Sequence, residues 1–303
     1  MLSLGRLSAW LAALPLVARA MAWMLLAVGL FSLTMVLVRL ATGVLHPFQI
    51  AFLRAFFGFL ILLPWLSRTG ISGLRTTKLS LHLIRAGVGT IGVLLWFSAL
   101  ALLPLAQAVA LSFTAPLFAT VFAATFLRER SGPRRLTAAG IGFLGTLIIL
   151  RPGVLVISPA AVLALASACA LAINIILTKI IVRTDSPDAT VTNMTLFLIP
   201  LSLPAAIWVW QWPDGPTLAL IAALGAVATS GHLCFARAMK LADASAILPL
   251  DFVRLPLTAL MAYLAFGEHV DLWTWAGAVI IAVSATYVAR REVTAAQQVP
   301  TKQ

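Results

Sequence analysis

Charged residues are scarce in this sequence. Only 10 % of the 303 residues are Asp, Glu, Lys or Arg, and nine residues in all are acidic. An average soluble domain carries about 25 % charged residues, which cover its surface. This chain is 62 % hydrophobic, with a mean hydropathy of +1.05. The composition excludes a soluble globular protein and predicts that lipid surrounds most of the chain.

Residue types that commonly act in catalysis or bind metals are also few. The two cysteines, Cys169 and Cys234, lie inside apolar stretches, which is typical of reduced packing residues and argues against a disulfide framework. The four histidines are scattered along the chain without metal-ligand spacing. We therefore expect no metal, no cofactor and no catalytic residues. A membrane enzyme is the least favoured class of function.

The apolar residues gather in ten stretches that approach the length of a membrane span, about 20 residues as a helix. These stretches are almost continuously apolar, whereas the strands of a membrane barrel alternate apolar with polar residues. The sequence therefore predicts an all-α integral membrane protein with ten transmembrane helices: Met21–Ala41, Phe48–Leu66, Leu83–Leu103, Ala106–Leu127, Leu136–Leu150, Pro159–Ile181, Val191–Trp210, Thr217–Leu241, Ala244–Phe266 and Leu272–Val288.

The basic residues indicate the orientation. They stand singly or in small groups between the apolar stretches, so the net charge of +12 does not indicate a nucleic-acid partner. If the N-terminus is cytoplasmic, 17 of the 21 Lys and Arg residues lie in or beside cytoplasmic loops, as the positive-inside rule favours. We therefore expect both termini on the cytoplasmic side.

The two ends of the chain are interpreted as short flanking segments. Residues 1–20 form an N-terminal lead-in, and residues 290–303 form a cytoplasmic tail. A signal peptide is the alternative for the N-terminus, because Ala18-Arg19-Ala20 matches an A-x-A cleavage site after an apolar run. Cleavage there would invert the topology against the charge bias, which favours the lead-in.

The two halves of the chain carry similar marks in the same order, about 140 residues apart. Each half has an Ala-x-Ala stretch, then a proline, then an apolar run that ends near a Phe and a Glu: Ala106, Ala108, Pro116, Phe126 and Glu129, followed by Ala242, Ala244, Pro256, Phe266 and Glu268. Five spans separate the copies, and an odd number reverses the direction of the chain. Residues 21–151 and 159–289 are thus predicted to be two inverted repeats, as in many secondary transporters.

These marks resemble the EamA family of the drug/metabolite transporter superfamily. The same likeness includes His46-Pro47 with Arg54, the stretch Ala242–Ser245, and Asp251–Pro256, and it extends over residues 22–290. The resemblance implies ten helices around a central cavity, in a multi-pass protein of the bacterial inner membrane. It also implies that the protein exports amino acids or related metabolites.

Secondary transport by alternating access is therefore the leading hypothesis. The expected partners are a small-molecule substrate and the lipid bilayer, and proton coupling is an open alternative to downhill export. A lipid flippase and a drug efflux protein of the same superfamily remain alternative functions. Because few polar groups reach the predicted cavity, hydrophobic or aromatic amino acids fit it better than sugars.

Charged residues inside the spans are the first candidates for substrate contact, because charges in a bilayer usually face a cavity or a partner. Arg54 could bind a substrate carboxylate through its guanidinium, or extend to the interface instead. Asp251 and Arg254 share one helix face, where Asp251 could take a proton or a cation. Equally, the two could neutralise each other and brace the helix.

Three uncharged or weakly basic residues complete the candidate site. His232 and Asn174 could contact substrate, or bond a neighbouring helix. Trp96 could line the cavity or simply pack in the core. Pro116, Pro249 and Pro256 are candidate hinge or gate residues, because prolines interrupt helices and free backbone groups.

Overall fold

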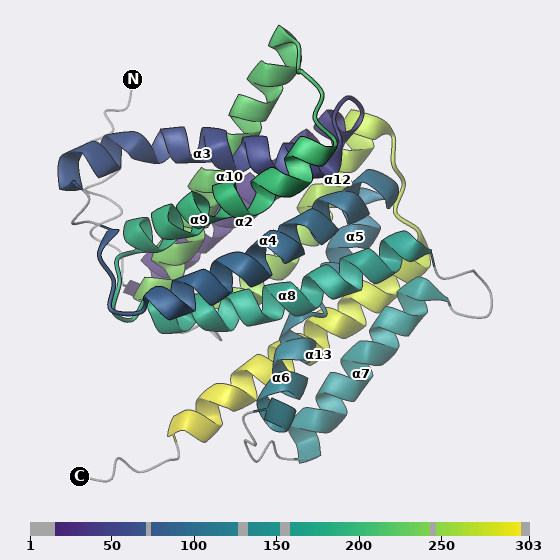
Figure 1. Ribbon diagram of the computed structural model, residues 1–303. Helices are drawn as coiled ribbons and strands as arrows, with labels where there is room; N and C mark the ends of the chain where they lie inside the picture. Colours follow the sequence, from purple (N-terminus) through teal and green to yellow (C-terminus); the bar gives the residue numbers. More distant parts are fainter. Residues whose placement is uncertain (1–15, 71–73, 127–132, 152–157, 243–246, 298–303) are drawn as a thin grey trace, which may run out of the picture.

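The protein is helical throughout the part that we describe. The computed structural model describes residues 16–70, 74–126, 133–151, 158–242 and 247–297. Regular structure within these ranges consists of α-helices and one 3-10 helix, η2 (Figure 1). The bounds are α2 Leu16–Thr42, α3 Pro47–Thr69, α4 Leu79–Leu102, α5 Leu105–Ser112, α6 Ala115–Phe126, α7 Pro133–Leu150, α8 Pro159–Ile181, α9 Pro187–Trp208, α10 Gly215–Leu241, η2 Leu248–Val253, α12 Arg254–Phe266 and α13 Leu272–Gln297.

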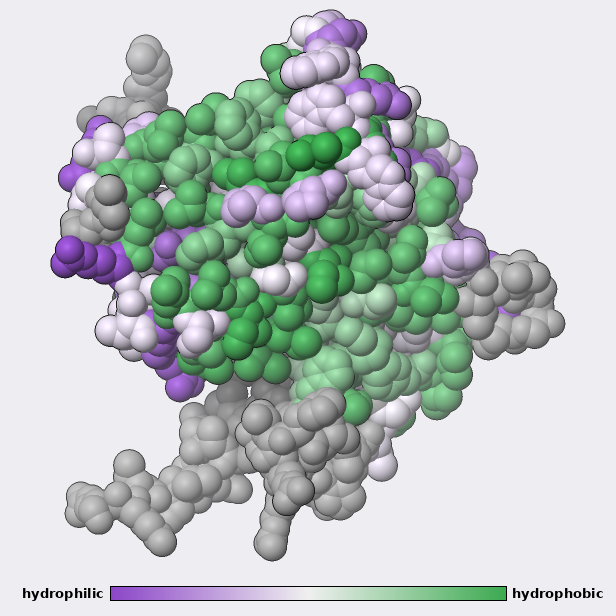
Figure 2. All heavy atoms as spheres, in the orientation of Figure 1, coloured by the Kyte–Doolittle hydropathy of each residue, from purple (hydrophilic) through white to green (hydrophobic). Residues whose placement is uncertain are grey.

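Six of these helices, α2, α3, α4, α8, α9 and α10, are long and apolar enough to cross a membrane. Shorter apolar segments cover 105–119, 140–150 and 272–284. Figure 2 shows a broad hydrophobic band on the visible face, with hydrophilic residues gathered toward its two sides. Large apolar side chains such as Leu264 and Val283 are 73 % and 66 % exposed. An exposed apolar surface of this extent suits lipid rather than water.

Local sequence explains where four of the long helices begin. His46, Ser158, Ser186 and Asp214 each accept a hydrogen bond from a backbone N–H of the first turn, and a proline follows within two residues. A side-chain cap satisfies a backbone donor that has no partner within the helix. The proline lacks an N–H at a position where none is needed. The chain therefore turns sharply between long helices.

The helices pack in a pattern that repeats between the two halves. Helix α2 packs against α10, and α8, the first helix of the second half, packs likewise against α4. Helix α3 contacts α10, as α9 contacts α4. Helices α3 with α9, α5 with α12, and α7 with α13 pair directly across the two halves. This repetition of helix contacts is expected if a two-fold axis relates the two halves of the chain.

Glycines allow the closest helix contacts. A Cβ atom built on Gly145 of α7 would lie 2.8 Å from the Gly277 carbonyl of α13. One built on Gly225 of α10 would lie 2.8 Å from the backbone nitrogen of Gly58 on α3. Small residues at such points allow backbones in a membrane to approach and pack closely.

Two of the predicted spans are interrupted close to prolines that the sequence marks as candidate hinges. The span predicted at Ala106–Leu127 is broken at Phe113–Thr114, between α5 and α6. The span predicted at Ala244–Phe266 begins, within the described residues, as the 3-10 helix η2 before α12. Pro116 is the second residue of α6 and Pro249 the second of η2, where a missing N–H is tolerated. Pro256 lies within the first turn of α12 and is exposed.

The ends of the chain differ from the expected boundaries. Helix α2 begins at Leu16, so residues 16–20 of the predicted lead-in are the start of the first long helix. Helix α13 continues to Gln297, into the predicted tail. The first 15 residues, the last six, Glu129 and Ser245 lie outside the described residues.

Candidate functional site

Arg54 is buried in the helix bundle and has no counter-ion among the described residues. It lies on α3 and is 6 % exposed. Its guanidinium carbon lies 5.9 Å from the ring centroid of Phe97 on α4, and its Nε has no hydrogen-bond partner. Arg54 forms no ion pair with any residue that the structure describes. The stacked guanidinium therefore retains unused donors for an acceptor-rich ligand.

A second buried arginine, Arg85, adds to this positive region. Arg85 on α4 is 5 % exposed, and its Nη1 donates to the Thr190 carbonyl at 3.2 Å, while its Nε has no partner. His232 lies on α10, which packs against α3, the helix that carries Arg54. Its ring packs edge-on against Phe31 with a centroid distance of 5.1 Å. We define the arginine pair as Arg54 and Arg85.

Asp251 and Arg254 form an ion pair where the two interrupted segments meet. Nη2 of Arg254 lies 2.8 Å from Oδ2 of Asp251 and 3.5 Å from the Ser112 hydroxyl. The guanidinium also lies 5.4 Å from the Phe113 centroid, and Phe113 packs edge-on against Phe252. The pair therefore connects the start of α12 to the end of α5, next to both helix breaks.

Among the described residues, neither Trp96 nor Asn174 makes a specific contact with the two buried arginines or with the Asp251–Arg254 pair. Trp96 is partly buried against the main hydrophobic core. The Asn174 side chain donates to the Ala170 carbonyl of its own helix at 3.0 Å and faces Gly89 of α4. The structure thus pairs Asp251 with Arg254, places Arg54 and His232 on the packed helices α3 and α10, and gives Asn174 a role in helix packing.

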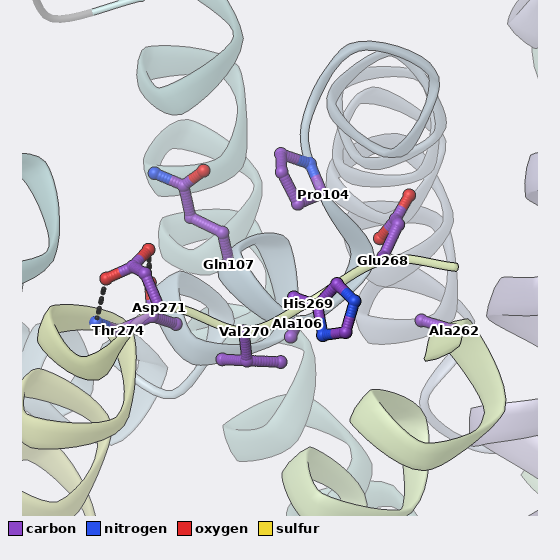
Figure 3. A pocket seen from close by; sticks show the side chains of 9 residues that line it. All are labelled: Pro104, Ala106, Gln107, Ala262, Glu268, His269, Val270, Asp271 and Thr274. Carbon is purple, nitrogen blue, oxygen red and sulfur yellow. Dashed lines mark hydrogen bonds between the residues drawn. The ribbon is translucent and has the colours of Figure 1, made fainter. Parts of the chain in front are cut away.

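One end of the bundle, which we name the α12–α13 end, is held by Glu268. Its Oε1 lies 3.1 Å from Nη2 of Arg39, and its Oε2 accepts from the Leu105 backbone N–H at 2.8 Å. Arg39 also donates to the carbonyls of Leu100 and Leu103. Three segments, α2, the α4–α5 turn and the α12–α13 turn, are therefore tied together. A small hollow of about 40 Å³ lies beside this contact, lined by Gln107, Glu268, His269, Asp271 and Thr274 among others (Figure 3).

The opposite end, which we name the α8–α9 end, is held by Asp185. Its Oδ2 lies 2.9 Å from Nε2 of His82, and both side chains are almost fully buried. Burial raises the pKa of Asp185, but hydrogen bonds from His82, Thr76 and Thr184 outweigh it and hold the pKa below its usual range. Asp185 is therefore ionised at neutral pH. A hollow of about 220 Å³ at this end is lined by Lys179, Val182, Arg183, Met239 and Lys240.

A family model matches the chain twice, over residues 18–151 and 158–290, as an EamA-like transporter. The chain belongs to the EamA-like transporter family. It is a multi-pass protein of the bacterial inner membrane, as the sequence predicted. The predicted family is confirmed as well.

Similar members of the EamA-like family carry different small molecules. A riboflavin transporter of Vibrio cholerae is 35 % identical, covering 77 % of this chain and 79 % of its own. A riboflavin transporter of Rhizobium johnstonii is 34 % identical, covering 89 % and 91 %. An S-adenosylmethionine uptake transporter of Rickettsia felis is 30 % identical, covering 80 % and 83 %. A solved crystal structure shares the fold, with a TM-score of 0.64 at 23 % identity over 91 % of this chain and 99 % of the other.

Three features of this EamA-like protein were not foreseen as parts of a site. Arg85 was counted among basic residues at the cytoplasmic edge, yet it is buried. Arg39 with Glu268, and His82 with Asp185, are separated by 229 and 103 residues, so sequence spacing gives no sign of either pair. The one signal in the sequence that could have pointed to such a residue was a basic residue inside an apolar stretch. Arg39 and Arg54 both show this signal.

Proposed function

We propose that this protein takes up riboflavin, or a heterocycle of similar flat aromatic shape, across the inner membrane. The observation that carries this proposal is the identity of 34–35 % with two riboflavin transporters, over most of each chain. Import rather than export is supported by relatives that are uptake transporters for S-adenosylmethionine. Amino-acid export, which the family resemblance implied, has no similar support.

The buried arginine over an aromatic ring suits this class of substrate. Riboflavin presents a planar ring system with two carbonyl groups, and a guanidinium can donate to such acceptors while its flat face rests on an aromatic side chain. Arg54 and Phe97 provide this pair of surfaces. We propose that the ring of the substrate contacts Arg54, with His232 on the facing helix α10 and Trp96 nearby on α4.

Ten spans in two inverted repeats are the topology that we propose. The matched family segments divide the chain into halves, and the helix contacts repeat between them. With α5–α6 and η2–α12 each counted as one interrupted span, every half has five crossings. By the positive-inside rule, both termini and the α8–α9 end are then cytoplasmic, and the α12–α13 end is periplasmic. Alternating access would open these two ends in turn.

Export is the second candidate direction. A pseudopaline exporter of Pseudomonas aeruginosa is 27 % identical over 86 % of this chain and 92 % of its own. Identity is lower than for the riboflavin transporters, so export ranks second. Drug efflux and lipid flipping are predictions without a specific observation in their favour.

Complementation of a riboflavin-requiring bacterium tests the proposal. The host should lack its own riboflavin importer and receive either this gene, an empty vector, or the Phe97→Leu variant. We expect growth at low external riboflavin and rapid entry of radiolabelled riboflavin only with the intact gene, and a KM several-fold higher for Phe97→Leu, because a cation–π contact is lost.

The same cells distinguish the alternatives. Unlabelled riboflavin should compete for entry, whereas phenylalanine should not. Absence of riboflavin entry, while the protein is present in the membrane, would refute the proposed substrate. Faster loss of preloaded riboflavin without faster entry would show the opposite direction.

A further inference from the structure

The two buried positive charges of the arginine pair have no negative partner among the residues that the structure describes. Arg54 and Arg85 are 6 % and 5 % exposed, and neither forms an ion pair with a described residue. Two other arginines within the described spans are neutralised. Arg254 pairs with Asp251, and Arg39 pairs with Glu268. A buried charge without a partner in an apolar bundle is unfavourable unless a ligand or water compensates it.

The two arginines lie at different depths along the bundle. Arg54 is seven residues after Pro47, which begins α3 near the α12–α13 end, so it lies about 10 Å from the start of that helix. Arg85 is six residues after Leu79, which begins α4 near the α8–α9 end, about 9 Å from that start. A solute that moves along α3 and α4 therefore meets a positive charge on each half of its route.

The unused donors of these arginines define the chemistry that they accept. The Nε of Arg54 and of Arg85 is buried without a hydrogen-bond partner. Guanidinium groups carry only donors, so they require carbonyl, carboxylate or phosphate oxygens. A solute with a net positive charge would leave these donors unsatisfied and would also be repelled.

We infer that Arg54 and Arg85 form a charge filter that accepts neutral or anionic acceptor-rich heterocycles and rejects cationic ones. The inference rests on the proposed transport of a heterocycle and adds a rule for its specificity. It separates this protein from the S-adenosylmethionine uptake transporters, although they are about 30 % identical. S-adenosylmethionine carries a net positive charge at neutral pH, whereas riboflavin is neutral.

A matched pair of compounds isolates the effect of charge. S-adenosylhomocysteine differs from S-adenosylmethionine by one methyl group and by the positive charge on sulfur. Binding of each, and of riboflavin, is measured on the purified full chain in detergent by equilibrium dialysis of the radiolabelled compound. We expect S-adenosylhomocysteine to bind more than about tenfold more tightly than S-adenosylmethionine.

Variants then assign the discrimination to the two arginines. Arg54→Gln and Arg85→Gln should each reduce the ratio of the two affinities several-fold, while Arg54→Lys should retain it because the charge remains. Arg68→Gln is the matched control, since Arg68 is exposed in the last turn of α3, the helix of Arg54, and its loss should leave the ratio unchanged. A single symmetric elution peak in size-exclusion chromatography establishes that each variant is folded.

Two outcomes would overturn the inference. One is equal affinity for the adenosyl pair, and the other is failure of the wild type to bind either neutral compound. A failure of the proposed riboflavin transport can be distinguished from a failure of the charge filter. If the filter discriminates and depends on Arg54 and Arg85, but riboflavin neither binds nor enters cells, then the charge rule stands and another neutral heterocycle is the substrate.

Discussion

At the scale of single residues, the pair Asp251–Arg254 decides between two hypotheses raised by the sequence. Either Asp251 takes up a proton during transport, or the two residues neutralise each other. The distance of 2.8 Å, with Arg254 only 8 % exposed, favours mutual neutralisation at the junction of η2 and α12. Breaking a buried pair by removing one partner leaves a buried charge and costs about 3–5 kcal/mol.

Mutual neutralisation of Asp251 and Arg254 predicts the behaviour of two variants. Asp251→Asn should lower both the thermal stability and the uptake of riboflavin, because Arg254 loses its counter-charge. Asp251→Asn combined with Arg254→Gln should recover most of the stability and some uptake. Thermal unfolding in detergent and uptake into liposomes without a proton gradient measure the two effects. A double variant as unstable as Asp251→Asn would contradict mutual neutralisation.

The residues of the candidate site were foreseen in part. Arg54 stands out in sequence because a lone arginine interrupts an apolar stretch, and it is buried without a partner. Asn174 stood out because it is a polar residue in an apolar stretch, yet its side chain donates a hydrogen bond to a carbonyl of its own helix. A polar residue in a span has several ways to be satisfied, and sequence does not distinguish a neighbouring carbonyl from a ligand. Contacts between distant segments, such as Arg39 with Glu268, depend on the fold alone.

At the scale of helices, the close contact of α7 with α13 rests on two glycines (Figure 1). A methyl group on Gly145 would meet the Gly277 carbonyl at 2.8 Å and the Ile281 side chain at 2.9 Å. The backbone carbonyl cannot move aside without separating the helices. Gly140, on the same helix, has nothing within 4 Å of its virtual Cβ.

Gly145→Ala should therefore destabilise the protein by about 1–3 kcal/mol, as overpacking does. Gly140→Ala should leave stability unchanged or raise it by about 1 kcal/mol, since alanine favours the helix. Both variants are compared by thermal unfolding in the same detergent. Equal effects of the two substitutions would show that helix propensity, and not the contact with α13, governs the result.

Helix positions were predictable where apolar runs and caps agree. Pro159–Ile181 was predicted with the bounds that α8 has, because Ser158 caps the helix and Pro159 follows it. The breaks at Phe113–Thr114 and at η2 are less visible in sequence, because Pro64, Pro200 and Pro204 lie inside helices α3 and α9 that continue through them. Whether a proline interrupts a membrane helix depends on which neighbouring groups satisfy the freed carbonyls.

At the scale of the whole molecule, transport requires that the contacts at the two ends open separately. Glu268 ties three segments at the α12–α13 end, and Asp185 ties α4 to the α8–α9 turn at the other. Because the pKa of Asp185 is lowered, its ionised form contributes stability above the unfolded value of about 4, and this contribution is lost as pH falls through the folded pKa.

Thiol labelling from each side of the membrane tests this arrangement. Ser112 lies next to the helix break and is 5 % exposed, so Ser112→Cys reports access to the centre once Cys169 and Cys234 are replaced by alanine. Glu268→Ala should increase labelling by a membrane-impermeant reagent added from the periplasmic side. Asp185→Ala should increase labelling from the cytoplasmic side instead, and neither should affect the opposite side. If Glu268→Ala exposes Ser112→Cys to the cytoplasmic reagent, then the orientation derived from the basic residues is inverted. If both substitutions expose it to both sides, the two ends do not act as separate gates.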